Sequence, residues 1–307
     1  MKSIIVNNLT KTYGKKNDKV LAVDDVSFDV DHGEIFGLIG PDGAGKTSIF
    51  RMLTTVLLPD SGAASIEGLN IVKDYKEIRT ILGYMPGRFS LYQDLTIEEN
   101  LEFFASVFNT TIAENYDLIK DIYVQIEPFK NRRAGKLSGG MKQKLALCCA
   151  LIHKPKVLFL DEPTTGVDPV SRKEFWEMLQ RLKKQEITIV VATPYMDEAA
   201  LCDRIGLMQN GKILSIDTPE NISNSYPDYI FEVKAGRTSA VLKALGEFDH
   251  KKNVYAYGEF VHLTLDKNDN INPSRIEEYL RKEGFENIEI NPIKASIEDS
   301  FIRLLAQ

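Results

Sequence analysis

The sequence predicts an α/β protein whose larger, N-terminal part is built on a parallel sheet. Three short apolar runs, at residues 35–39, 157–160 and 187–192, have the length and character of buried strands, and each is followed by a loop and a helical pattern. Strands that alternate with helices in this way form parallel sheets covered by helices. A smaller α+β unit follows toward the C-terminus.

The segments around this sheet predict two additions to it. Residues 4–6 and 22–30 show the partial alternation expected of an N-terminal antiparallel β subdomain. Between residues 90 and 152 the apolar spacing turns helical, and Thr96 with Glu99 forms a capping-box signature, so this stretch is predicted to be a helical subdomain. Asn210-Gly211 separates two apolar runs and predicts a two-residue hairpin turn.

A polar segment with two prolines, residues 219–227, predicts a break between two domains. We place the boundary between residues 222 and 223. Residues 223–307 then follow the order strand, helix, two strands, helix, strand and helix, which is typical of a small α+β domain. This part of the sequence offers no clustered acid, base or metal set, so we expect it to serve regulation or dimerisation.

Composition and charge argue against several classes of protein. The formal net charge of -6 does not favour nucleic acid as a partner. The longest apolar run, residues 145–152, is far shorter than the roughly 20 residues that span a bilayer, and the first residues lack the apolar core of a secretory signal. Cys148, Cys149 and Cys202 are too few for a disulfide framework and are predicted to be core residues. We expect a cytoplasmic protein.

One glycine-rich segment has the pattern of a phosphate-binding loop, and it lies between the first buried strand and a helix expected over residues 47–57. Glycines let successive backbone N–H groups face a phosphate, and the helix adds its positive N-terminal end. We expect Lys46 to reach the β- and γ-phosphates as a catalytic cation and Thr47 to hold Mg²⁺. The predicted nucleotide-binding residues of this loop are Gly40, Asp42, Gly43, Ala44, Gly45, Lys46, Thr47 and Ser48.

Two carboxylates end the second buried strand. Asp161 and Glu162 come directly after the run at residues 157–160, and strand ends in such sheets open onto the ligand crevice. We expect Asp161 to bind Mg²⁺, directly or through water, and Glu162 to polarise the attacking water as general base. These two motifs together resemble those of P-loop NTPases, which implies a RecA-like parallel sheet.

A third motif makes the resemblance specific. Leu137-Ser138-Gly139-Gly140-Met141-Lys142-Gln143 lies between the other two, and Pro163-Thr164-Thr165-Gly166-Val167-Asp168 follows Glu162. With these segments the chain resembles ATP-binding subunits of ABC transporters, of the drug- and antibiotic-exporter (ABC-2) type. The resemblance implies that residues 1–222 form the nucleotide-binding domain, and it continues through an exporter-type C-terminal extension.

The resemblance also implies how ATP is held and what the partners are. Ser138, Gly139 and Gly140 would cap a helix that points at the γ-phosphate of ATP bound to a facing subunit, so that MgATP lies between two cassettes. Tyr13 resembles the aromatic residue that stacks on adenine. Separate transmembrane permease subunits would be further partners and would hold this chain on the inner face of the cell membrane.

Two positions depart from the family pattern, and both concern chemistry. The family has a glutamine that contacts Mg²⁺ and water where this chain has Gly87, and a switch histidine where this chain has Pro194. Proline has neither a side-chain donor nor a backbone N–H. Loss of one preorganised donor at a developing charge costs about 10²–10³ in rate. We therefore predict ATP binding with slow hydrolysis.

The departures suggest an asymmetric dimer. This chain would pair with a different cassette and donate its intact Ser138 segment to the partner's competent site, while a homodimer with two weak sites is the competing arrangement. Two other functions are open at this point. One is a nucleotide-gated regulatory module with negligible hydrolysis, and the other is a soluble ABC ATPase that acts on ribosomes or DNA, which the single phosphate loop does not favour.

Overall fold

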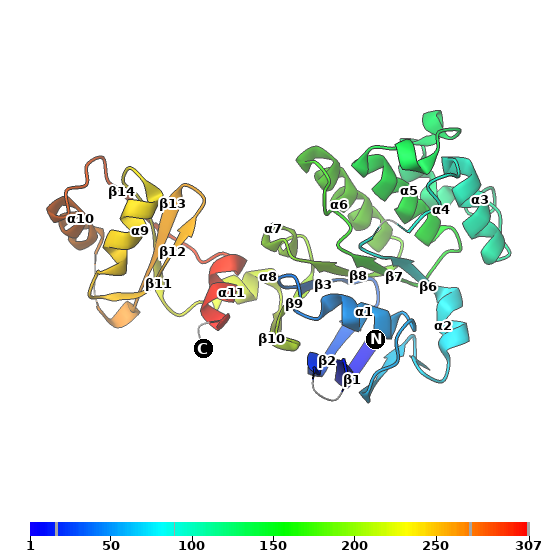
Figure 1. Ribbon diagram of the computed structural model, residues 1–307, viewed down its shortest axis with the longest axis horizontal. Helices are drawn as coiled ribbons and strands as arrows, with labels where there is room; N and C mark the ends of the chain where they lie inside the picture. The colour runs from blue at the N-terminus through cyan, green and yellow to red at the C-terminus, as the bar shows by residue number, and fades with distance from the viewer. Residues whose placement is uncertain (16–17, 89, 270–271, 306–307) are drawn as a thin grey trace. The chain divides into compact units, whose positions relative to one another are not determined.

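The computed structural model describes residues 1–15, 18–88, 90–269 and 272–305, and it divides the chain into two compact units, Met1–Pro219 and Glu220–Gln307. Figure 1 labels most of their helices and strands. The division falls just before the boundary predicted between residues 222 and 223. In the part of the chain that is described, no helix combines the length and the apolar character needed to cross a bilayer.

The centre of the first unit is a six-stranded, mostly parallel sheet with the order β10-β9-β3-β8-β7-β6 (Figure 1). Every residue of β3, β7 and β8 is buried, as expected for strands with both faces covered. Only the β9–β10 pair at one edge is antiparallel, and Asn210 and Gly211 join those strands with the positive φ angles that a tight hairpin needs. The strands are β3 (Ile35–Ile39), β6 (Leu82–Met85), β7 (Val157–Asp161), β8 (Thr188–Thr193), β9 (Arg204–Gln209) and β10 (Lys212–Asp217).

A second, antiparallel sheet with the order β2-β1-β4-β5 forms the predicted N-terminal β subdomain. It shares a core with the parallel sheet, because Phe28 stacks on Phe36 with ring centroids 5.3 Å apart and Phe50 meets Phe159 edge-on at the same distance. Phe50 lies on the helix α1 (Lys46–Leu53), so one core fixes that helix against both sheets. The strands are β1 (Lys2–Tyr13), β2 (Val20–Asp31), β4 (Ser61–Ile66) and β5 (Leu69–Asn70).

The helix after the glycine-rich loop is shorter than predicted. The sequence pattern places it over residues 47–57, whereas α1 ends at Leu53 and Thr54 caps it. Thr55 has a φ of 61°, in the left-handed region where a helix cannot continue. The apolar residues beyond Thr55 therefore belong to the following turn.

The helical subdomain predicted over residues 90–152 is present, and Thr96 and Glu99 close the capping box at the start of its first helix. All three cysteines are free and buried, as predicted. The remaining helices of the unit are α2 (Tyr75–Ile81), α3 (Ile97–Val107), α4 (Tyr116–Tyr123), α5 (Gly139–Leu151), α6 (Pro169–Lys183) and α7 (Met196–Ala199), with short 3₁₀ turns η1 (Glu127–Phe129) and η2 (Ala134–Lys136).

The second unit is an antiparallel sheet with the order β12-β13-β11-β14 whose apolar face packs against α9 and α10. The polar break predicted over residues 219–227 is wrong in part, because Pro219 opens a helix; proline fits the first helical turn, where its missing N–H is not needed. The elements are α8 (Pro219–Asn224), β11 (Tyr229–Lys234), α9 (Thr238–Gly246), β12 (Lys251–Tyr257), β13 (Phe260–Leu265), η3 (Lys267–Asp269), α10 (Pro273–Lys282), β14 (Glu289–Ile293) and α11 (Ile297–Leu305).

The last helix is attached to this sheet by one fully buried carboxylate. Asp299 accepts a hydrogen bond from Tyr255 at 2.5 Å and lies 2.7 Å from Nδ1 of His262, while its other oxygen accepts from the backbone N–H and hydroxyl of Ser296. Burial raises the pKa of Asp299, but the hydrogen bonds from His262, Tyr255 and Ser296 outweigh it and lower the pKa to about 2.

We expect Asp299→Asn to destabilise the second unit by about 2 kcal/mol near pH 7. A carboxyl whose pKa is lower in the folded state stabilises the fold above its unfolded pKa, and this contribution disappears as the pH falls from about 4 to about 2. Urea unfolding of both forms across this range, with hydrogen exchange of the α11 amides to locate the loss, measures it. The exposed variant Glu278→Gln is the control; a difference between Asp299→Asn and the wild type that is the same at every pH would contradict the account.

Candidate nucleotide-binding site

The parallel pairing of the central sheet brings the predicted site residues to one edge. The strands β3, β6, β7 and β8 run in the same direction, so their carboxyl ends meet there. The glycine-rich loop leaves β3, Gly87 follows β6, Glu162 follows β7 and Pro194 follows β8. Four motifs that are far apart in the sequence are thus delivered to one crevice.

The glycine-rich loop depends on the lack of a side chain at two positions. Gly45 has a φ of 108°, and a Cβ there would lie 2.2 Å from the carbonyl oxygen of Ala22. A Cβ on Gly40 would lie 2.2 Å from the carbonyl oxygen of Met208. The loop therefore lies directly against neighbouring backbone, and a hydrogen bond of 2.9 Å from the N–H of Gly211 to the carbonyl of Ala44 fixes it further.

Lys46 lies inside this loop. Its ammonium donates to the carbonyl oxygens of Gly40 at 2.7 Å and Pro41 at 2.9 Å, and the residue is buried. Burial lowers the pKa of Lys46, and the carboxylates of Glu162, Asp42 and Asp161 oppose that shift. The cation is therefore held where phosphate oxygens would meet it.

Thr47 and Asp161 are adjacent, as a shared Mg²⁺ would require. The hydroxyl of Thr47 donates to a carboxylate oxygen of Asp161, with 3.2 Å between the two oxygens. Neighbouring oxygen ligands in an octahedral Mg²⁺ shell at 2.0–2.1 Å lie about 3 Å apart, so the pair fits the ion. Burial raises the pKa of Asp161 above its usual value, and the hydrogen bond from Thr47 offsets only part of this rise. Thr47 and Asp161 would supply two ligands, and phosphate oxygens and water would fill the remaining positions.

Glu162 continues from Asp161 with a change of backbone direction. Its φ is 50°, in the left-handed region, and its N–H donates to the carbonyl of Ala192 at 2.8 Å. One carboxylate oxygen accepts a hydrogen bond of 3.3 Å from Thr165. The chain therefore bends at the residue that follows β7.

The two departures from the family pattern follow the strands on either side of β7, since Gly87 comes after β6 and Pro194 after β8. A Cβ on Gly87 would lie 3.1 Å from the carbonyl oxygen of Asp161 and 3.7 Å from the Cβ of Glu162. A side chain at position 87 would therefore start beside the backbone of Asp161 and the first side-chain carbon of Glu162. Pro194 follows Thr193, the last residue of β8, whose carbonyl accepts a hydrogen bond from the N–H of Gly40.

The other predicted residues occupy two further places. The hydroxyl of Tyr13 lies 3.2 Å from that of Ser48 on α1, and the tyrosine is 38% exposed. Ser138 caps α5 by accepting a hydrogen bond from the N–H of Met141. Both Ser138 and Gly139 are exposed, and a Cβ on Gly139 would lie 3.2 Å from the carbonyl oxygen of Gly166. The start of α5 thus lies beside the loop that follows Glu162.

The sequence pattern did not reveal a buried carboxylate behind this site. Glu198 on α7 is 2% exposed and contacts Thr164, Thr193 and Arg172. An acidic residue in the polar stretch after a strand looks like an ordinary helix-start residue. Only the close packing of three chain segments gives it a role.

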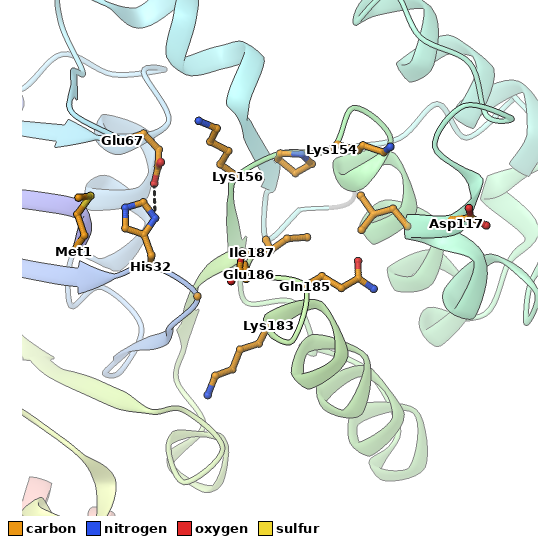
Figure 2. Close-up of a pocket in the computed structure, with 13 residues that line it drawn as sticks. Met1, His32, Glu67, Asp117, Lys154, Lys156, Lys183, Gln185, Glu186 and Ile187 are labelled. Carbon is orange, nitrogen blue, oxygen red and sulfur yellow. Dashed lines mark ion pairs between the residues drawn. The ribbon is translucent and has the colours of Figure 1, made fainter.

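A large hollow of about 1170 Å³ lies at the opposite edge of the sheet, lined by residues that precede β3, β7 and β8. Figure 2 shows that its lysines Lys154, Lys156 and Lys183 point in different directions and that His32 faces Glu67, with 3.3 Å between them. The drawn side chains do not converge on a common point. The hollow therefore carries no further part of the site.

The fold and the loop define the class of protein: a parallel sheet with a phosphate loop after β3 and two carboxylates after β7 is a P-loop nucleotide-binding protein. Comparison with known proteins narrows the class. A model of the ABC transporter family matches residues 23–165. The solved structure of cbiO1 from Clostridium perfringens, part of the ABC transporter complex cbiONQ, superimposes with a TM-score of 0.64 and 25% identity over 73% of this chain and 91% of that chain.

Two relatives agree with this family. The probable multidrug ABC transporter ATP-binding protein YbhF of Escherichia coli (strain K12) is 36% identical over 307 residues, which are 98% of this chain and 52% of YbhF, so this chain spans about half of that relative. The doxorubicin resistance ATP-binding protein DrrA of Mycobacterium tuberculosis (strain ATCC 25618 / H37Rv) is 36% identical over 75% of this chain and 70% of DrrA. The chain belongs to the ABC transporter ATP-binding proteins, which confirms the resemblance stated from its motifs.

We expect Gly45→Ala to weaken ATP binding at least tenfold, because the new Cβ meets the Ala22 carbonyl and must displace the loop. Gly43→Ala is the matched control. Gly43 also has a positive φ, of 79°, but a Cβ there has no atom within 4 Å. Titration with a fluorescent ATP analogue measures the affinity of both variants. Equal losses of affinity would show that backbone strain, and not the clash with the Ala22 carbonyl, causes the weaker binding.

Proposed function

We propose that this chain binds MgATP between itself and a second cassette and hydrolyses it slowly, and that the complex drives export through separate membrane subunits. The observation that carries the proposal is the meeting of Lys46, Thr47, Asp161 and Glu162 at one edge of the sheet, with Thr47 and Asp161 oxygens 3.2 Å apart. Because the chain belongs to the ABC transporter ATP-binding proteins, we infer that the nucleotide is ATP. The relatives named for multidrug and doxorubicin resistance favour export.

The reaction follows from the placement of these groups. The N–H groups of the loop and the Lys46 ammonium bind the phosphates, and Thr47 with Asp161 would hold Mg²⁺, which neutralises charge on the β- and γ-phosphates. Glu162 accepts a proton from water as the water oxygen bonds to the γ-phosphorus. The bond from that phosphorus to the β–γ bridging oxygen breaks, and ADP leaves with the electron pair. The products are ADP and phosphate.

Slow hydrolysis is proposed because this reaction lacks two helpers. Nothing at Gly87 extends toward the water, and Pro194 offers no donor to the γ-phosphate. The binding groups remain complete. The same observation favours a second candidate function, in which the chain is a nucleotide-gated regulatory module whose own hydrolysis is negligible.

The exposed start of α5 supports pairing with another cassette. Ser138 and Gly139 are exposed and carry the N-terminal end of a helix of 13 residues, which is a ready site for an anion. We propose that this end completes the partner's site, and that the partner is a different cassette with the helpers that are missing here. A homodimer with two slow sites is the competing arrangement.

A partly apolar groove supports a membrane partner. A cavity of about 380 Å³ is lined by Leu91, Phe104 and Phe108 of the helical subdomain and by Gly87. A helix from a membrane subunit seated there would be linked to the acidic strand end through Gly87. Such docking would hold the chain on the cytoplasmic side of the membrane. We propose that the second unit regulates or supports dimerisation.

We expect Gly87→Gln combined with Pro194→His to raise the rate of ATP hydrolysis about 10- to 100-fold, since each change returns a polar group to the γ-phosphate region. The position at residue 87 has room if its neighbours shift by a few tenths of an ångström. Steady-state phosphate release measures the rate. Gly87→Ala with Pro194→Ala is the control, and an equal gain there would show that backbone changes, not the polar groups, cause the increase.

The full complex tests the asymmetric arrangement. In the dimer with its second cassette and the membrane subunits, we expect Ser138→Ala to lower turnover much more than Glu162→Gln, because Ser138 serves the fast partner site and Glu162 serves the slow one. Transport-coupled ATP hydrolysis is the measurement, with MgATP affinity of the isolated chain alongside. Equal losses favour the homodimer, and absence of Mg²⁺-dependent ATP binding contradicts the proposed function itself.

A further inference from the structure

One buried carboxylate joins three segments behind the acidic strand end. One oxygen of Glu198 accepts a hydrogen bond of 2.5 Å from the hydroxyl of Thr164 and one of 3.0 Å from the guanidinium of Arg172. The other oxygen accepts a hydrogen bond of 2.6 Å from the hydroxyl of Thr193. Because Glu198 is 2% exposed, these contacts replace its hydration.

Two of the three partners come from the strand ends that carry the proposed site, and the third comes from the helix that follows. Thr164 follows Glu162 by two residues, in the loop after β7. Thr193 is the last residue of β8, directly before Pro194. Arg172 lies on α6, whose first turn is capped by Asp168 of the same loop. Glu198 therefore connects the loop that follows Glu162, the proposed general base, to the end of β8.

The partners of Glu198 are themselves held in place. The guanidinium of Arg172 also pairs with Asp197 at 3.2 Å and lies 4.5 Å from the centre of the Tyr195 ring. The hydroxyl of Thr193 accepts a hydrogen bond of 3.1 Å from the N–H of Tyr195. The segment that contains Pro194 is thus fixed on both sides. A buried charge with full hydrogen bonding and a cationic partner restricts movement more than exposed pairs do.

We propose that Glu198 is a positioning residue for ATP hydrolysis: it sets the place of the Glu162 loop relative to the end of β8. The inference rests on the proposed function, because it concerns the rate of the step that Glu162 catalyses. The position of Glu162 matters more in this chain than in a cassette with polar side chains at both positions. Here neither residue 87 nor residue 194 carries a polar side chain that would help orient the water.

This role predicts a change in turnover without a change in binding. Glu198→Gln keeps the shape of the side chain but replaces one acceptor oxygen with a donor and removes the charge that pairs with Arg172. A shift of the Glu162 loop on the order of 1 Å lowers the rate up to about 100-fold. We expect kcat to fall 10- to 100-fold, with KM and the affinity for MgATP unchanged within about twofold, because Thr164, Arg172 and Thr193, the hydrogen-bond partners of Glu198, lie outside the phosphate loop.

Glu34→Gln is the matched control. Glu34 is also a buried carboxylate with an arginine partner, since it is 7% exposed and lies 3.4 Å from Arg204, but it precedes β3 at the far edge of the sheet. We expect this variant to lose stability and to keep its kcat. Thermal melts measure the stability of both variants, and kcat is calculated per folded molecule. Together they separate a loss of stability from a loss of catalytic rate.

Thr164→Val keeps the test valid if Glu198→Gln does not fold. Valine has the shape of threonine and lacks the hydroxyl, so it removes one contact of Glu198 on the side of the catalytic loop. We expect Thr164→Val to lower kcat at unchanged KM, and the double variant with Glu198→Gln to be no slower than the slower single variant.

The outcomes test the positioning role of Glu198 separately from the proposed hydrolysis of ATP. A fall in kcat confined to Glu198→Gln and Thr164→Val supports positioning. An unchanged kcat in both, or an equal fall in Glu34→Gln, overturns it, because stability alone would then account for the effect. If the wild-type chain shows no hydrolysis that Glu162→Gln removes, the proposed hydrolysis is itself wrong and the positioning role is overturned with it.

Discussion

The parallel pairing of β3, β8, β7 and β6 is the constraint on which the nucleotide site depends. Each strand ends at the same edge and supplies a different part there: the phosphate loop, the end that carries Pro194, the two carboxylates and Gly87. The parts lie close together, because the hydroxyl oxygen of Thr47 is 3.2 Å from a carboxylate oxygen of Asp161. A parallel sheet needs crossover helices, and these bury its strands on both faces. The edge at which the strands end is then the place where polar side chains can gather.

The chemistry of the site is divided between parts that bind and parts that assist attack. The residues proposed to bind MgATP lie together, with the Lys46 ammonium inside the loop and Thr47 beside Asp161. The two positions that lack a polar side chain, residues 87 and 194, follow the strands that flank β7. This distribution separates affinity from rate, because binding the ground state does not require the donors that act on the transition state.

The buried Glu198 gives the site a rigid support that the exposed motifs alone do not have. Burying a carboxylate is costly unless charge and hydrogen bonds compensate it, and here a guanidinium and two hydroxyls do so. Such a network fixes the relative place of α6, α7 and the ends of two strands. The second unit repeats the device with Asp299, which attaches α11 to a sheet through His262 and Tyr255.

The sequence by itself determined the fold class, the order of the elements and the family, because apolar strands of fixed length and glycines at fixed spacing leave local traces in the chain. The places of Gly40, Lys46 and Asp161 in the fold were predictable for that reason, and their roles at the site stay predictions. The end of α1 at Leu53 was not, because the sequence does not mark the left-handed conformation of Thr55. The helix opened by Pro219 was missed because proline occurs both in breaks between elements and in the first turn of a helix. Only the tertiary structure decided the role of Glu198. Its partners lie on three segments, and no local pattern records a contact made by packing.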